Sequence, residues 1–152
     1  RGQNRLVLGG SLHWIFQEAN MEIFNLLDFT DRIKLREWLK VNHNQAKSCW
    51  VVTSRSKQPT YECIPYIEVI EEALCFGWID STLKKLPDGR LAQRLSPRRK
   101  GSHWTELNKE RCINLEDRGL MTDAGRQAFE KAYSYEIVPK GSLMEEKPHS
   151  LI

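Results

Sequence analysis

Residues 73–81 read ALCFGWIDS, and this stretch decides how the chain folds. Its first four residues end an apolar helix that we expect to begin at Pro65, because proline suits the first turn of a helix. Gly77 then stands where a left-handed backbone commonly ends a helix. From Trp78 onward the residues are typical of a strand. The stretch therefore predicts a helix, a reversal of the chain and a strand in succession.

The helix before the reversal has one apolar side at helical spacing. We expect that side to be buried, with Tyr66, Ile67, Ile70, Ala73 and Leu74. The acidic residues between them are expected to face away, and they are Glu68, Glu71 and Glu72.

A β-hairpin is predicted directly after the reversal. Its first strand covers residues 78–86, its turn is signalled by Pro87-Asp88-Gly89, and its second strand covers residues 90–95. Side chains alternate between the two faces of a strand. One face of the second strand therefore carries Leu91, Gln93 and Leu95. We expect the other face to be polar and exposed, with Arg90, Ala92 and Arg94.

The rest of the chain predicts three further helices and one further strand. The helices cover residues 30–41, residues 102–116 and a region that follows Thr122, and the strand covers residues 48–53. A hydroxyl residue suited to N-capping precedes each helix, namely Thr30, Ser102 and Thr122. The predicted fold class is α+β, in which a small antiparallel sheet with a central hairpin at about residues 78–95 is packed with about four helices.

The length of 152 residues is typical of one domain. We expect residues 1–20 to be a leader or an added extension outside the core, residues 21–136 to form the domain, and residues 137–152 to be a flexible tail. The longest apolar run is far below the length that a membrane span requires. We therefore expect a cytoplasmic protein without membrane insertion.

Positive charge is concentrated in one part of the chain. Residues 84–100 carry a net charge of +6, whereas the whole chain carries +3, so the remainder is negative. Such a local excess points to an anionic partner more directly than the overall charge does. The alternative is a solvated hairpin face that only keeps the protein soluble.

Several kinds of site have no pattern in this sequence. No Cys-x-x-Cys pair occurs, and we expect reduced thiols at Cys49, Cys63, Cys75 and Cys112. The four histidines lack the spacing of metal ligands. Glycine-rich nucleotide-binding patterns and the Gly-x-Ser-x-Gly elbow do not occur either. The sequence therefore predicts no metal and no cofactor, and it disfavours a nucleotide hydrolase or a serine esterase.

The basic segment, which we define as Arg98-Arg99-Lys100, lies just before the helix expected from Ser102. A helix N-terminus presents free N–H groups, and arginine binds phosphate or carboxylate with two parallel hydrogen bonds, so together they predict an anion site. Nearby tryptophans offer surfaces for base stacking, with core packing as the competing interpretation. Alternatively, Ser102 only caps the helix and the cations are solvated. The candidate ligand-binding residues are Trp78, Arg94, Arg98, Arg99, Lys100, Ser102, Trp104 and Asn108.

Two carboxylates are weak candidates for acid–base chemistry. Asp80 lies at the start of the first hairpin strand, and Glu72 lies on the preceding helix. Asp80 is also placed to pair with Arg94 across the hairpin, which is the commoner role of such a carboxylate. Because spacing alone does not make a carboxylate pair catalytic, an enzyme is the alternative rather than the main hypothesis.

Four blocks of the sequence resemble one known family. Residues 71–81, EEALCFGWIDS, are similar to the signature of the YdeI/OmpD-associated family, also called bacteriocin-protection proteins. Further similar blocks follow in the same order, at residues 93–98, 102–108 and 119–125, and the likeness covers about residues 24–135. The chain departs from the family pattern at Thr105, where serine is usual, and at residues 54–57, which are less rich in lysine.

The resemblance implies a small bacterial-type cytoplasmic protein with a link to bacteriocin or stress tolerance, and it implies no settled enzymatic activity. Our first hypothesis is a non-catalytic binding module for an anionic small molecule, such as a phosphate-bearing one, or for a nucleic acid. The alternatives are an enzyme that acts on an anionic small molecule through Asp80 and Glu72, and a protein–protein interaction domain.

Overall fold

The computed structural model describes residues 22–137. The expected leader over residues 1–20 and all but the first residue of the expected tail over residues 137–152 lie outside the described residues. In chain order, the elements are β1 (Leu26–Leu27), α1 (Arg32–Asn42), β2 (Cys49–Ser54), β3 (Ile64–Pro65), α2 (Tyr66–Cys75), β4 (Trp78–Lys85), β5 (Leu91–Pro97), α3 (Glu106–Asp117) and α4 (Asp123–Ile137).

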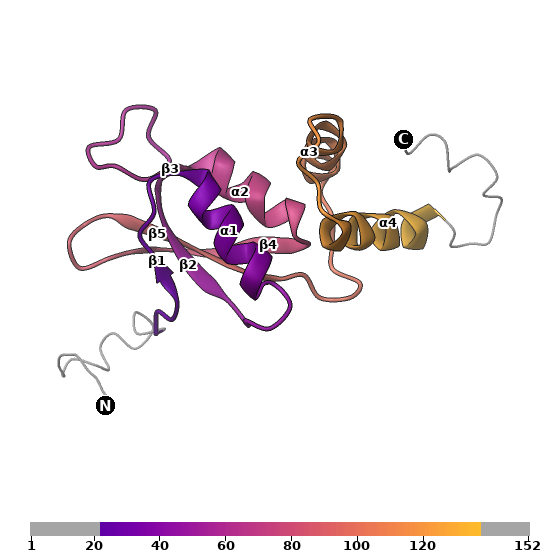
Figure 1. Cartoon of the computed structure of the whole chain (residues 1–152), viewed down its shortest axis with the longest axis horizontal. Helices are drawn as coiled ribbons and strands as arrows, with labels where there is room; N and C mark the ends of the chain where they lie inside the picture. The colour runs from indigo at the N-terminus through magenta and orange to yellow at the C-terminus, as the bar shows by residue number, and fades with distance from the viewer. Residues whose placement is uncertain (1–21, 138–152) are drawn as a thin grey trace.

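The described residues form an α+β fold, as the sequence predicts (Figure 1). The sheet has the strand order β1-β2-β5-β4, with β3 also paired to β2. The β4–β5 hairpin and the β2–β5 pair are antiparallel. Two short strands that the sequence does not predict, β1 and β3, pair with β2 in parallel. The sheet is therefore mostly antiparallel, and the hairpin provides two of its three long strands.

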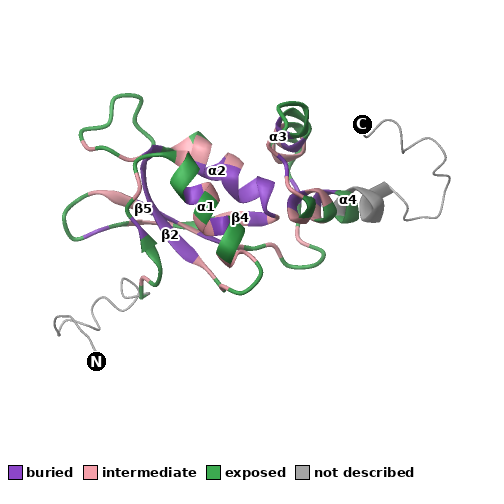
Figure 2. Ribbon diagram, viewed as in Figure 1, coloured by how far each residue is buried: buried purple, intermediate pink, exposed green. Residues whose placement is uncertain are grey.

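The helices are distributed unevenly around this sheet. Figure 1 shows α1 and α2 on one face, with α3 and α4 beyond the end of the sheet where α2 leads into β4. The main core lies under α1 and α2, and the buried residues are coloured purple in Figure 2. Leu35 and Leu39 of α1 pack there, one helical turn apart. Asp31 caps α1 by accepting a hydrogen bond from Ile33 N at 2.8 Å, one residue later than the expected cap at Thr30.

The reversal at Gly77 is held from two directions. Gly77 has a φ of 75°, the left-handed conformation predicted for it. Its carbonyl accepts a hydrogen bond from Arg98 N at 3.1 Å, which ties the end of β5 to the turn. A Cβ at Gly77 would lie 3.1 Å from Ala124 O of α4. Positive φ and close backbone approach both favour glycine here.

The prediction for the buried face of α2 is wrong at two positions. Ile67 is 47% exposed, whereas Glu72 is only 1% exposed. The physical reason is that α2 is covered on more than one side, because it contacts α1, α3 and α4 as well as the sheet. A single apolar stripe therefore does not describe its buried surface.

The prediction that Arg90, Ala92 and Arg94 form an exposed face is also wrong in part. Ala92 is fully buried, in a second cluster with Trp50, Val52 and Leu86. This cluster lies on the sheet face opposite the main core, because residues next to one another in a strand point to opposite faces. Both faces of the sheet thus bury apolar side chains, although α1 and α2 cover only one of them.

Candidate anion-binding site

The basic segment leaves β5 as a tight turn rather than as a helix start. Ser102 N donates to Arg99 O at 3.0 Å, and Gly101 has a φ of 78°, as a type II turn requires at that position. The N-cap of α3 is Thr105, whose hydroxyl accepts from Asn108 N at 3.1 Å. The predicted cap at Ser102 is therefore wrong, because the turn and an extended stretch separate Ser102 from the helix.

Arg98 is the partly buried cation of the basic segment. Its guanidinium carbon lies 3.7 Å from the centre of the Trp104 ring, a cation–π contact. Its Nη1 donates to Ser102 Oγ and to the His103 carbonyl, both at 3.3 Å. Its Nε and Nη2 are buried without a hydrogen-bond partner. Burial lowers the pKa of Arg98, as expected when a charged group loses water without gaining a close carboxylate.

Other polar side chains lie around Arg98. Asp80 of β4 accepts a hydrogen bond from Tyr66 Oη at 3.4 Å, and its charge acts on Arg98 to raise the pKa of the guanidinium, against the larger effect of burial. Arg55 stacks over the Tyr66 ring at 4.4 Å. Arg111 of α3 acts electrostatically on Tyr66 and donates to Asn108 Oδ1 at 3.0 Å. Three arginines from three parts of the chain therefore lie near the hydrogen-bonded pair of Tyr66 and Asp80, with Arg98 acting on Asp80 and the other two acting on Tyr66.

These three arginines, Arg55, Arg98 and Arg111, are called the arginine cluster below. None of them makes an ion pair within 4.0 Å to a carboxylate of residues 22–131, whose side chains the structure describes. The same holds for Arg99 and Lys100, whose side chains are exposed. The part of the chain that the structure describes therefore leaves positive charge uncompensated around the basic segment.

Two predicted site residues lie apart from this cluster. Asp80 is paired opposite Leu95 in the hairpin, so the neighbouring Arg94 points to the other face of the sheet. The expected Asp80–Arg94 ion pair is absent from the described residues for that reason, and Arg94 instead donates to Ser81 Oγ at 3.3 Å. Trp78 is only 1% exposed and donates from Nε1 to His43 O at 3.2 Å. It is a core residue, in agreement with the competing interpretation.

The remaining predicted residues do lie near one another in this part of the chain. Arg98 contacts Ser102 and Trp104 directly, and Arg99 and Lys100 form the turn beside them. Asn108 is linked to the arginine cluster through Arg111. Trp104 is 4% exposed. The Arg98 guanidinium lies over its ring, and the tilted ring of Phe129 of α4 contacts it with 5.5 Å between ring centres.

Arg55, Tyr66 and Arg111 have no sequence pattern that points to the site. They come from the loop after β2, the start of α2 and the middle of α3. Only the fold brings them together, and their residue types are common on any surface. The start of α2 at Tyr66, just after Pro65, was the one available indication that this aromatic residue stands at an element boundary.

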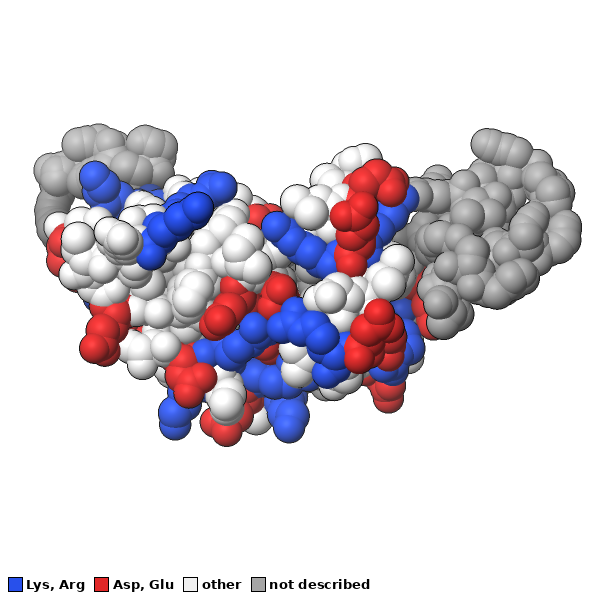
Figure 3. Space-filling view, turned by 90° about the horizontal axis from the view of Figure 1, so that it is seen from above, with Lys and Arg blue, Asp and Glu red and all other residues white. Residues whose placement is uncertain are grey.

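Charge on one side of the molecule is mixed rather than uniformly basic. Figure 3 shows Lys and Arg side chains interspersed with Asp and Glu, with uncharged surface between them. No group of three or more His, Cys, Asp or Glu side chains within residues 22–137 is arranged to hold a metal ion. Over the same residues, no helix has both the length and the apolar character that crossing a bilayer requires.

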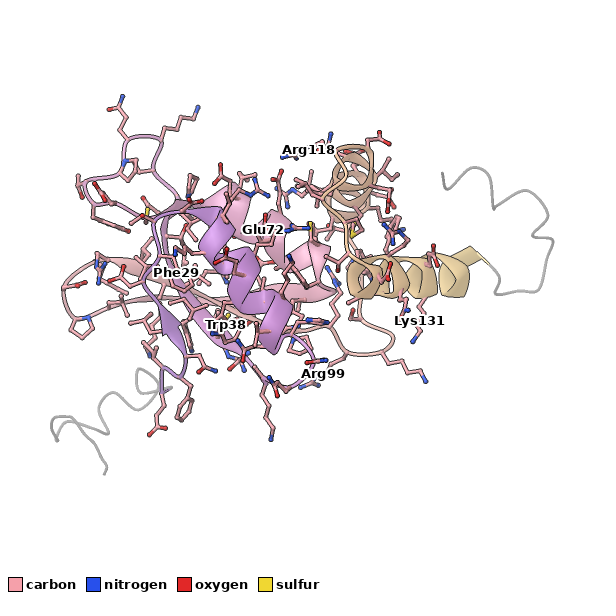
Figure 4. The ribbon with its side chains drawn as sticks, viewed as in Figure 1. Phe29, Trp38, Glu72, Arg99, Arg118 and Lys131 are labelled. Carbon is pink, nitrogen blue, oxygen red and sulfur yellow. The ribbon has the colours of Figure 1, made fainter. Side chains whose placement is uncertain are left out.

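Glu72, the other acid–base candidate, lies between two arginines of α1. Its carboxylate accepts from Arg32 Nε at 2.7 Å and from Arg36 Nη1 at 2.9 Å. Arg36 also donates from Nη2 to Leu120 O, at the turn between α3 and α4. Figure 4 shows Glu72 between α1 and α2, well apart from Arg99. The geometry gives Glu72 a structural role, because both carboxylate oxygens are occupied.

No curated protein and no solved structure matches the chain. One family does match, over residues 27–128, and its description is "Domain of unknown function". These residues include all of the main core except Phe129, and also the hairpin, the basic segment and the arginine cluster. Because the match spans more than half of the chain, the protein belongs to the Domain of unknown function (DUF8412) family.

Proposed function

We propose that this domain is a binding module for a small phosphate-bearing anion, which it holds at the basic segment through Arg98. The observation that carries the proposal is the state of the Arg98 side chain. It lies over the Trp104 ring, two of its three nitrogens are buried without a hydrogen-bond partner, and burial lowers its pKa. An anion bound beside Nε and Nη2 would supply the hydrogen-bond acceptors and the negative charge that the described residues do not place there.

The energetics favour a ligand with more than one negative charge. A buried guanidinium is costly unless an anion compensates it, and among the described side chains Asp80 is the carboxylate that acts electrostatically on Arg98. Arginine forms paired hydrogen bonds with phosphate oxygens. Arg99 and Lys100, exposed on the adjacent turn, add charge that a phosphate can also contact. A phosphate ester fits this arrangement better than a simple carboxylate.

A small ligand is favoured over a nucleic acid. Trp78 is in the core, and Trp104 is covered by Arg98 and Phe129, so neither ring offers a free face for stacking a base. Figure 3 shows mixed charge rather than a continuous basic surface on the face that it displays. A dedicated nucleic-acid binder concentrates Lys and Arg along a stripe.

The proposal includes a cellular role for the domain. The motif blocks at residues 71–81 and 93–98 resemble the YdeI/OmpD-associated family, and this likeness supports a role in bacteriocin or stress tolerance in a bacterial cytoplasm. An enzyme with Glu72 as acid or base is not proposed, because Arg32 and Arg36 occupy that carboxylate.

The test is thermal unfolding with inorganic phosphate, pyrophosphate and a 5′-phosphorylated oligonucleotide, each at matched ionic strength. Ligand that binds only the folded state raises the melting temperature in proportion to ln(1 + [L]/Kd). We expect a shift with pyrophosphate larger than that with phosphate, and a smaller shift at high salt, because salt screens exposed charges. A shift with the oligonucleotide alone would instead support nucleic-acid binding and contradict the proposal.

The matched variants are Arg98→Gln and Arg94→Gln. Both remove one positive charge from the same strand region, but Arg94 points to the sheet face opposite Asp80. We expect the pyrophosphate shift to disappear in the first variant and to remain in the second. If Arg98→Gln unfolds, the pair Arg99→Glu and Lys100→Glu tests the same site on exposed side chains. Equal shifts in all variants would overturn the proposal.

A further inference from the structure

A cavity of about 290 Å³ lies between α3 and α4. Its lining includes the nearly buried side chains of Cys112, Met121 and Phe129. Ile113, on the same helix as Cys112, also lines the cavity and is 43% exposed. The lining is therefore apolar both where it is buried and where it is exposed. An apolar lining is the usual character of a small-molecule site.

The polar lining of this cavity is predominantly acidic. Glu116, Asp117 and Glu130 contribute carboxylates, and Arg126 is the one cation among the lining residues that the structure describes. Arg126 is already engaged, because its Nε and Nη2 each lie 2.9 Å from a Glu116 oxygen and its Nη1 lies 2.8 Å from Asp123. This pairing lowers the pKa of Glu116. Within residues 22–137, Asp117 and Glu130 make no ion pair with a cation.

We propose that this cavity binds a small free organic cation with an apolar body, such as an aralkyl ammonium ion. The apolar body would contact Phe129, Met121 and Ile113, and the ammonium group would lie at the opening beside Asp117 and Glu130. The site differs from the anion site in the sign of its charge, although Cys112 and Phe129 of its lining adjoin Arg98 and Trp104. The proposal does not depend on the proposed function.

The charge of the lining selects among ligands of similar shape. A neutral aralkyl alcohol would gain the apolar contacts but not the attraction of the two carboxylates. An aralkyl carboxylate of the same size would meet their repulsion. The cavity is at the small end of known ligand sites, so a body of one aromatic ring with a short chain suits it. The expected order of affinity is therefore cation, neutral molecule, anion.

The test uses three probes that share one ring and chain length: phenethylammonium, 2-phenylethanol and phenylacetate. Binding is measured on the full chain by ligand-observed nuclear magnetic resonance and by calorimetry, up to about 10 mM, which covers affinities as weak as millimolar. We expect the ammonium probe to bind more tightly than the alcohol by roughly two- to fivefold for each carboxylate, the range of a solvent-exposed charge pair. The phenylacetate probe should bind most weakly.

Neutral isosteres identify the charges responsible. Asp117→Asn and Glu130→Gln should each reduce phenethylammonium affinity roughly two- to fivefold, again the size of an exposed pair, without changing that of 2-phenylethanol. Glu110→Gln is the control, because Glu110 is an exposed acid of α3 that does not line the cavity. Equal binding of all three probes, no binding by any of them, or an equal effect of the control would overturn the proposal. Binding only of a lysine-containing peptide would reassign the site to a protein partner.

Discussion

Replacing Glu72 with glutamine tests the ion pairs that join α1 to α2. The change keeps the shape of the side chain and removes its charge. Arg32 and Arg36 then face a neutral amide with one acceptor oxygen instead of two, although Arg32 keeps its ion pair with Glu71 at 3.0 Å and Arg36 keeps Leu120 O. The side chain of Glu72 is 1% exposed, whereas those of Arg32 and Arg36 are 20% and 22% exposed. Water therefore reaches the arginines in part.

The expected loss follows from this partial exposure. Breaking a fully buried ion pair by removing one partner costs about 3–5 kcal/mol, and access of water to the two arginines reduces the loss to roughly 2–4 kcal/mol. For a domain of this size, each kcal/mol corresponds to roughly 3–6 °C in melting temperature. We therefore expect Glu72→Gln to unfold at a clearly lower temperature and urea concentration, with an unchanged urea m-value.

A double-mutant cycle gives the decisive number. Arg36→Met and Glu72→Gln, alone and together, should show a coupling free energy of about 1–3 kcal/mol, because the two side chains are in direct contact. Glu110→Gln, at an exposed position of α3, should change stability by less than about 0.5 kcal/mol. A loss below about 1 kcal/mol for Glu72→Gln, or a coupling near zero, would refute the reasoning from these ion pairs.

Three further changes have expected outcomes that unfolding experiments check. Gly125→Ala should destabilise the fold by about 1–3 kcal/mol despite the better helix propensity of alanine, because its Cβ would lie 2.3 Å from Cys75 O. Thr105→Ala should cost about 1 kcal/mol and Ser102→Ala less than half of that, because Thr105 is the observed cap. Stability should fall as the pH rises above 9, because burial raises the pKa of Cys112 to about 12 and that of Cys75 to about 11.

The sign of the alkaline effect follows from proton linkage. A thiol whose pKa is higher in the folded state contributes stability that is complete below its unfolded pKa of 9.0 and is lost as the pH rises toward the folded value. The slope is at most about 1.4 kcal/mol per pH unit for each thiol. Cys112→Ala should flatten it. A flat profile between pH 9 and 11, or an effect of Ser102→Ala as large as that of Thr105→Ala, would contradict these expectations.

The helix–reversal–hairpin order could be predicted because local signals agree with one another there. Pro65 at the helix start, Gly77 at its end and the hairpin turn all act over a few residues. Thr122 is likewise confirmed as a capping residue, since its hydroxyl accepts from Gly125 N at 3.3 Å. The local sequence is sufficient to predict a feature wherever the local backbone conformation decides which residue type is favoured.

The site could be predicted only in its contiguous part. Arg98 and Trp104 are close in sequence and do meet in space. The burial of Glu72 could not be predicted, because its partners Arg32 and Arg36 lie 40 and 36 residues away in sequence. A glutamate on a helix is also normally solvated. Pairings between distant segments depend on the whole fold, and one amphipathic pattern cannot describe a helix that is covered on several sides.

The junction at the end of α2 bears on how the molecule opens. Thr122 donates to the Cys75 carbonyl from both its backbone N, at 3.2 Å, and its hydroxyl, and Gly125 packs against the same carbonyl. The first turn of α4 thus serves as an external cap for α2. If α4 detaches, the last turn of α2 loses those donors at the same moment. In hydrogen–deuterium exchange the last turn of α2 and the first turn of α4 should therefore exchange as one cooperative unit, although 47 residues separate Cys75 from Thr122.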